Sequence, residues 1–427
     1  MKMLLRGITV VDPAAAGAAA EDVLIADGKI VARATNLTLP EGAREIDARG
    51  DYLVPGLCDL RVTVGEPGNE QRETLLAAQT AAANGGVTAF LCMPDCDPAL
   101  DSPAAVHYLR SLAQLPVVDV HASARLTRAG DDTTLAPMLE LLQSGVQVFG
   151  NGAGPLKDAE MLRRAMAYVG PSGAVVSDLP LEASLAQGAQ MNAGPVADEL
   201  GLPSSPAVAE KLGAARLLWL AQQTGAQVHI PAVGCRATLD FLRSERGGGA
   251  QFSAACNLLN LILTDEKLRS FNTWFKQHPP LRSADDAAAL LDALAKGAID
   301  CVASNHRACA LHEKDVEFEV AEAGSRNLEL LAPILWSLAV AAGKISPQRF
   351  VELVSTNPRK IMGLPPISLS AGSAANCAVI SVNPGILTAL PAPQSDFALD
   401  PAWLKARVRY TINASHVWDC AASAMMD

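Results

Sequence analysis

Three residues that can bind metal ions recur at three-residue spacing in one segment of the chain: His306, Cys309 and His312. Imidazole and thiolate are ligands that suit zinc, which usually takes four of them in a tetrahedron. All three lie on one short stretch, and no barrel residue is placed in the sequence to complete the set. We therefore expect no metal site here, although an enzyme with a remodelled metal centre remains an open alternative.

A second candidate group lies in residues 55–68, where strand alternation places Arg61 and Thr63 on one face. A guanidinium stays protonated in proteins and repels a divalent cation, and a threonine hydroxyl is a poor metal ligand. We expect Arg61 to fill the mouth of the fold and to pair with an acid such as Asp95 or Asp178. A buried charge left alone would be costly.

Other reactive side chains have structural interpretations. His229 and His121 lie within apolar runs and are expected to be packing histidines. Ser177 has no histidine near it in sequence and no Gly-x-Ser-x-Gly turn around it, so covalent serine chemistry is not expected. The glycine-rich residues 150–154 and 247–249 lack the Gly-Lys-Ser/Thr ending of a phosphate loop and are expected to be turns.

Short apolar segments alternate with amphipathic ones after residue 57 and could position these side chains. Eight candidate strands span residues 57–64, 87–93, 117–122, 146–149, 173–177, 227–233, 251–256 and 299–304. Helical spacing of apolar residues is clearest in residues 73–83, 158–168, 207–223 and 284–295. Eight such units predict an α/β fold of the (β/α)8 TIM-type barrel class.

The two ends of the chain have a different texture, with short alternating strands and an Asp-Gly turn. Neither end alone has enough strands to be stable. We therefore expect residues 1–54 and 364–427 to form one small β domain, and residues 55–363 to form the barrel.

Composition limits the partners. The net charge of -11 and the pI near 5.2 argue against binding to nucleic acid or to an anionic membrane surface. The nine cysteines are scattered without a Cys-x-x-Cys pair, and we expect neither a secretory leader nor a membrane span. These features predict a soluble cytoplasmic protein with reduced thiols.

Motifs along nearly the whole chain resemble those of the cyclic amidohydrolases, and most closely the dihydroorotases. Residues 55–68 (PGLCDLRVTVGEPG) resemble the family's first barrel strand, P-G-x-x-D-x-H-x-H-x-R-E-P-G. Residues 85–94, 277–282 (QHPPLR) and 298–303 resemble three further family signatures. The resemblance implies metal ions that activate water to split or close a cyclic amide.

The resemblance also implies where ligands and substrate contacts should lie, and each of those places differs here. The replaced positions are Arg61 and Thr63 for two histidines, Gly65 for a substrate arginine, Asp95 for an asparagine, Asn151 for a bridging carboxylate, Leu179 and Ala232 for histidines, and Asn305 for the aspartate that serves as ligand and general base. An amide cannot take up a proton at neutral pH. We therefore expect no metal cofactor, no catalytic residue and no enzyme activity.

Within the family, the chain looks most like the non-catalytic dihydroorotase-like chain that accompanies aspartate transcarbamoylase in some bacteria. The resemblance implies a structural subunit that supports the transcarbamoylase trimers in pyrimidine biosynthesis, within a large hetero-oligomer such as a dodecamer. Two alternatives stay open. One is an active cyclic amidohydrolase with a changed substrate, metal-independent or with a remodelled metal centre. The other is a ligand-binding regulatory barrel in which Arg61 holds a carboxylate.

Overall fold

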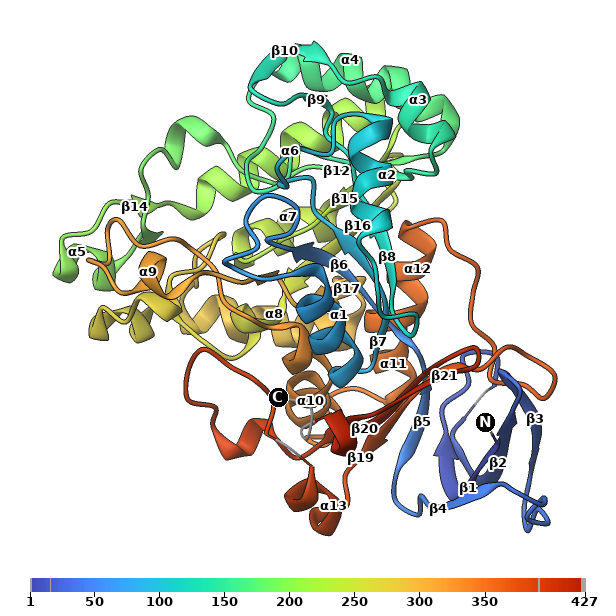
Figure 1. Cartoon of the computed structure of the whole chain (residues 1–427). Coiled ribbons are helices and arrows are strands. Elements are labelled where there is room, and N and C mark those ends of the chain that lie inside the picture. Colours follow the sequence, from blue (N-terminus) through green and yellow to red (C-terminus); the bar gives the residue numbers. More distant parts are fainter. Residues whose placement is uncertain (1, 16, 391, 424–427) are drawn as a thin grey trace.

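The computed structural model describes residues 2–15, 17–390 and 392–423, and consists of a barrel and a smaller β domain (Figure 1). Eight parallel strands that line the barrel match the segments expected from the sequence. They are β6 (Leu57–Thr63), β7 (Val87–Cys92), β8 (Asp119–Ala122), β11 (Val148–Phe149), β12 (Val175–Ser177), β15 (Gln227–Ile230), β16 (Phe252–Asn257) and β17 (Cys301–Ala303).

The barrel closes through a ninth short strand. β18 (His306–Arg307) continues β17 after two residues and pairs in parallel with β6, with His306 opposite Val62. A single bridge between Ala124 and Phe149 joins the β8 side to β11. Asn305, between β17 and β18, has a φ of 54°, a left-handed conformation that asparagine tolerates better than most residues. The turn at Asn305 therefore lets the last strand reach the first.

Helices surround the barrel strands in Figure 1. The longer ones are α1 (Leu75–Asn84), α2 (Pro103–Ser111), α4 (Ala159–Val169), α6 (Ala207–Thr224), α7 (Arg236–Glu245) and α8 (Ala284–Lys296). Side chains at their starts satisfy free backbone N–H groups. Thr74 accepts from Ala77 N at α1, Asp158 accepts from Met161 N at α4, and Ser283 forms a capping box with Asp286 at α8.

Both ends of the chain build the small β domain. Its sheet has the order β21-β20-β19-β5-β1-β2-β3, with β4 paired to β1. The strands are β1 (Lys2–Val10), β2 (Ala19–Ala26), β3 (Lys29–Ala34), β4 (Arg44–Asp47), β5 (Tyr52–Pro55), β19 (Asn376–Ser381), β20 (Arg407–Asn413) and β21 (His416–Asp419). The expected fold class is confirmed. Of the bounds expected for this domain, residues 1, 16, 391 and 424–427 lie outside the described residues.

The β domain is fastened to the barrel by hydrogen bonds from its C-terminal strands. Thr411 donates from Oγ1 to the carbonyl oxygen of Ala83 at 2.6 Å, at the end of α1. Trp418 donates from Nε1 to Oδ1 of Asn84 at 2.8 Å. Asn376 accepts from the hydroxyl of Thr88 on β7 at 2.8 Å. These contacts make the sheet a lateral support of the first two barrel units.

Within the described part of the chain, no helix is both long and apolar enough to cross a bilayer. None of the nine cysteines, all of which lie in the described residues, forms a disulfide, and eight of them are buried.

Trp336 connects the two parts of the fold and provides a test of it. Its ring lies 4.7 Å from that of Tyr52 on β5 and 4.9 Å from that of Phe350 in α11 (Pro347–Val351), and it is 1% exposed. Trp336→Ala should lower the free energy of unfolding in urea by about 3–5 kcal/mol because it leaves a cavity. The matched change at Trp219, which is 58% exposed, should cost under about 1 kcal/mol. Equal losses would contradict the packing described.

Candidate functional site

Arg61 lies at the carboxyl end of β6, in the mouth of the barrel. Its side chain is buried, and Nε donates to Oδ1 of Asn305 at 2.8 Å. The acid pairing expected from the sequence is not formed among the described residues, because Asn305 on the closing turn is nearer than Asp95 or Asp178. Burial lowers the pKa of Arg61 to about 10, although both carboxylates oppose that change through space. Nη1 of Arg61 is buried without a hydrogen-bond partner.

Asp59, which lies two residues before Arg61 on β6, stabilises the backbone at this end of the strand. Its fully buried carboxylate accepts from the backbone N–H of Arg61 at 3.0 Å and from that of Ser304 at 3.1 Å. It therefore ties β6 to the segment that follows β17. Burial raises the pKa of Asp59, which makes the neutral acid easier to form there than in water.

Asp95 follows β7 and lies among three cations. Burial raises its pKa, while the guanidinium groups of Arg307, Arg61 and Arg125 act in the opposite direction. The backbone N–H of Ala153 also donates to this carboxylate. The carboxylate that replaces the family asparagine therefore has three guanidinium groups near it.

Asn151 connects two loops through its side-chain amide. Its Oδ1 accepts from Leu126 N at 3.1 Å, and its Nδ2 donates to Oγ1 of Thr127 at 3.1 Å. Beside it, Asp178 accepts from Leu156 N at 3.0 Å, and burial raises the pKa of this carboxyl to about 6. The amide at position 151 therefore serves the packing of the loops after β8 and β11.

Three further positions hold no polar group. Leu179 and Ala232 come together in one apolar cluster with Leu181 and Ala209. Gly65 lies so close to backbone oxygens of the following loop that a side chain would not fit there. Thr63 ends β6 opposite Arg307 of β18. The structure thus brings the replaced positions to one end of the barrel but gives them separate surroundings.

The histidines have several partners inside the protein. His306 is within 2.8 Å of Oε2 of Glu73, and its Nδ1 accepts from the backbone N–H of Asn327 at 3.0 Å. Both ring nitrogens of His306 are occupied, as a structural histidine requires. His229 contacts the hydroxyl of Ser253 at 2.8 Å through Nδ1, while its Nε2 is buried without a partner. Burial lowers the pKa of His229 to about 3.

Sequence reasoning missed two features of this end of the barrel. His278 reaches the carbonyl oxygen of Ala153 at 2.8 Å, and burial lowers its pKa to about 4. Glu210 and Arg282 form a buried ion pair at 3.2 Å, each with 2% of its side chain exposed. The QHPPLR motif contains both His278 and Arg282 and was the available signal, whereas Glu210 lies in an ordinary helical pattern.

The donor set does not fit the metal centre that the resemblance implies. The ligand positions hold a guanidinium, a hydroxyl, two amides and two aliphatic side chains. The two amides, Asn151 and Asn305, stand where the family has carboxylates. In residues 2–15, 17–390 and 392–423, no group of three or more His, Cys, Asp or Glu side chains is placed to hold a metal ion.

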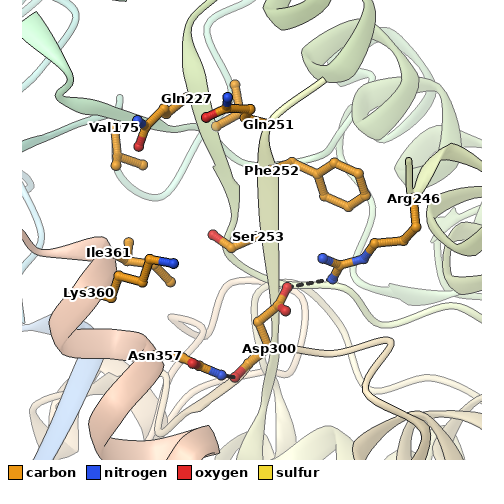
Figure 2. A pocket seen from close by; sticks show the side chains of 11 residues that line it. Val175, Gln227, Arg246, Gln251, Phe252, Ser253, Asp300, Asn357, Lys360 and Ile361 are labelled. Carbon is orange, nitrogen blue, oxygen red and sulfur yellow. Dashed lines mark hydrogen bonds and ion pairs between the residues drawn. The ribbon is translucent and has the colours of Figure 1, made fainter. Parts of the chain in front are cut away.

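A separate cleft opens at the amino end of several barrel strands (Figure 2). It has a volume of about 370 Å³ and is lined by the first residues of β12, β15 and β16. Along one wall, Cζ of Arg246 lies 4.6 Å from the ring centroid of Phe252. Nη2 of the same guanidinium forms an ion pair with Oδ2 of Asp300 at 2.5 Å. Lys360 lies on another wall, from α12 (Asn357–Ile361).

Comparison with known proteins gives consistent relatives. Residues 50–237 match a family described as Dihydro-orotase-like. The chain is 37% identical to a dihydroorotase of Pelotomaculum thermopropionicum and 35% identical to one of Trichlorobacter lovleyi, in each case over 89% of both proteins. Its fold is similar to that of an L-hydantoinase from Arthrobacter aurescens, with a TM-score of 0.83, 20% identity, and coverage of 97% of this chain and 95% of the other.

These relatives correct one expectation. We expected the chain not to be an enzyme, whereas relatives at 35–37% identity over most of its length carry the name of an enzyme. That expectation was based only on the positions at which the dihydroorotases carry metal ligands and substrate contacts. The mouth contains other groups with shifted pKa values, namely the buried carboxyls of Asp95 and Asp178, which a ligand count does not include.

The raised pKa of Asp178 predicts a pH effect on stability. The folded protein retains a proton on Asp178 up to about pH 6, whereas the ordinary pKa is 3.8. Its stabilising contribution is therefore complete below the ordinary pKa and is lost as the pH rises through the folded pKa. Relative to Asp178→Asn, the wild-type free energy of unfolding should fall by about 2–3 kcal/mol between pH 4 and pH 7.

The control for that measurement is Asp240→Asn, because Asp240 is an exposed carboxylate on α7. Urea titrations at several pH values should show a nearly constant difference between wild type and this control variant, within about 0.5 kcal/mol. If the difference in free energy of unfolding between wild type and Asp178→Asn does not change with pH, the pKa of the Asp178 carboxyl is not raised in the folded protein.

Proposed function

Because the chain belongs to the dihydroorotase family, we propose that it serves pyrimidine biosynthesis as a subunit that binds aspartate transcarbamoylase and supports its assembly. The observation that carries the proposal is the structural use of the replaced positions. Asn305 holds Arg61, Asn151 joins two loops, and Leu179 and Ala232 pack together. These residues stabilise the mouth of the barrel as part of a scaffold.

The motifs support the same partner. The replacements at residues 61, 63 and 65 keep the surrounding PG and EPG frame, which is the pattern that resembles the transcarbamoylase-associated chain. A cytoplasmic location suits this role, since the buried cysteines form no disulfide in the described residues and thiols stay reduced there.

Co-expression with the aspartate transcarbamoylase chain of the same cell tests the proposal. We expect one complex of fixed stoichiometry in size-exclusion chromatography with light scattering. The transcarbamoylase activity of that complex should survive heating better than that of the enzyme alone, because binding to the folded form stabilises it. Bovine serum albumin at the same concentration is the control for non-specific protection. Separate elution at micromolar concentrations would contradict the proposal.

The names of the relatives favour a second function, turnover of a cyclic amide by this barrel. Asp95 is the best-placed proton acceptor, because it is partly accessible and its pKa is raised by burial. Water would add to the ring carbonyl carbon as Asp95 takes its proton. The carbon–nitrogen bond would then break, and the proton would pass to the departing nitrogen.

Dihydroorotate hydrolysis measured with and without added zinc tests this second function. Asp95→Asn should lower kcat by about a hundredfold or more, since an amide cannot accept the proton. Asp97→Asn, at an exposed position two residues later, is the matched control and should retain the wild-type rate. An unchanged kcat in Asp95→Asn would exclude Asp95 as the proton acceptor.

A further inference from the structure

Several exposed apolar side chains belong to one segment that follows β18. The segment begins with α9 (Leu311–Lys314) and runs to residue 322. Leu311 and Val320 are 71% and 69% exposed, and Val316 is also exposed. Phe271 is exposed beside them, with its ring 6.1 Å from that of Phe318. We call Leu311, Val316, Val320 and Phe271 the 311–322 surface.

The backbone beneath this surface is held by two buried lysines. Lys314 donates from Nζ to the carbonyl oxygens of Thr273 at 3.0 Å and Glu322 at 2.6 Å. Lys276 donates to those of Phe318 at 2.8 Å and Glu319 at 3.0 Å. Burying an ammonium group opposes folding unless it is well bonded. Burial lowers the pKa of Lys314 to about 8, in keeping with that cost.

Phe318 anchors the same segment from below. It is buried in an apolar cluster with Val196 and Ala197 of α5 (Pro195–Leu200), and α5 and α9 lie side by side in Figure 1, away from the β domain. The segment therefore presents its exposed side chains on an ordered backbone. A surface that is ordered before binding loses less conformational entropy when a partner binds.

The charges of the segment are divided between two sides. Glu313 pairs inward with Arg72 at 2.5 Å, and Glu322 pairs with Arg307 at 3.3 Å. Three other carboxylates are exposed and form no ion pair among the described residues: those of Asp315, Glu317 and Glu319. The apolar surface thus has an acidic border that is not neutralised within the chain.

We propose that the 311–322 surface is the docking site for a partner protein surface in which lysines or arginines border an apolar patch. The inference rests on the proposed function, so the partner is the transcarbamoylase chain. Apolar contact would supply affinity, and the acidic border would supply steering and register.

The same charges disfavour other occupants. In a symmetric contact between two copies, each acidic border would face its own equivalent, and the chain as a whole carries a net charge of -11. An anionic membrane would be repelled for the same reason. A basic protein surface is the occupant that satisfies both the apolar and the acidic parts.

Paired variants with matched chemistry test the site in the co-expressed, full-length complex. Leu311→Arg with Val320→Arg places cations where a basic partner would meet them. The control is Val208→Arg with Leu212→Arg, because these residues are comparably apolar, 50% and 44% exposed, and one turn apart on α6. The Leu311→Arg, Val320→Arg variant, called the loop variant, should bind the transcarbamoylase about tenfold or more weakly than wild type does. The control variant should lose less than about twofold in affinity.

A third variant, Glu317→Lys with Glu319→Lys, probes the border. It should slow association and reduce the dependence of binding on salt. Thermal unfolding of each free variant should match wild type because the changed side chains are exposed.

The outcomes separate the two proposals. If wild type binds the transcarbamoylase and the loop variants bind equally well, the docking site is wrong and the proposed function stands. If wild type does not bind, both fall. Loss of binding in the α6 variant alone would place the interface on that helix and overturn the docking site. If the free chain is a dimer that the Leu311→Arg, Val320→Arg variant dissociates, the surface is a self-contact and the inference is overturned.

Discussion

The buried carboxylate of Asp59 is the constraint on which the mouth of the barrel depends. A barrel must join its first strand to its last, and here the backbone N–H of Ser304 is bound by a side chain from β6. The same carboxylate holds the N–H of Arg61, which sets the direction in which the guanidinium leaves the strand. Because an unbonded carboxylate at this depth would be costly, the strands are held together as long as both donors remain in place.

Arg61 and Asn305 follow from that closure. The segment after Ser304 must turn to place β18 beside β6, and Asn305 adopts the required left-handed conformation. In that conformation its amide oxygen accepts from Arg61. One residue therefore serves backbone geometry and charge satisfaction together, which explains why the guanidinium has an amide partner where an acid was expected.

The sequence predicted the barrel strands well because each is a compact apolar run followed by an amphipathic helix. It did not predict β9 (Thr127–Arg128), β10 (Asp131–Leu135), β13 (Met191–Asn192) or β14 (Ser204–Ser205), which are too short or too polar to show a period. The replaced positions lie at one end of the barrel, but their partners depend on side-chain direction, which the sequence does not show. The buried pair of Glu210 and Arg282 joins residues 72 positions apart, and no local pattern connects them.

The shared sheet has a consequence for the order of folding. β5 pairs with β19, so Leu53 lies opposite Val379, and every barrel strand lies between them in the chain. During synthesis the N-terminal strands must wait with one edge of β5 unpaired until the barrel has emerged. Pairings this distant form slowly, and open edges invite association with other chains. The pairing of β5 with β19 is therefore a late step of assembly, and the nascent chain is exposed to misassembly until it forms.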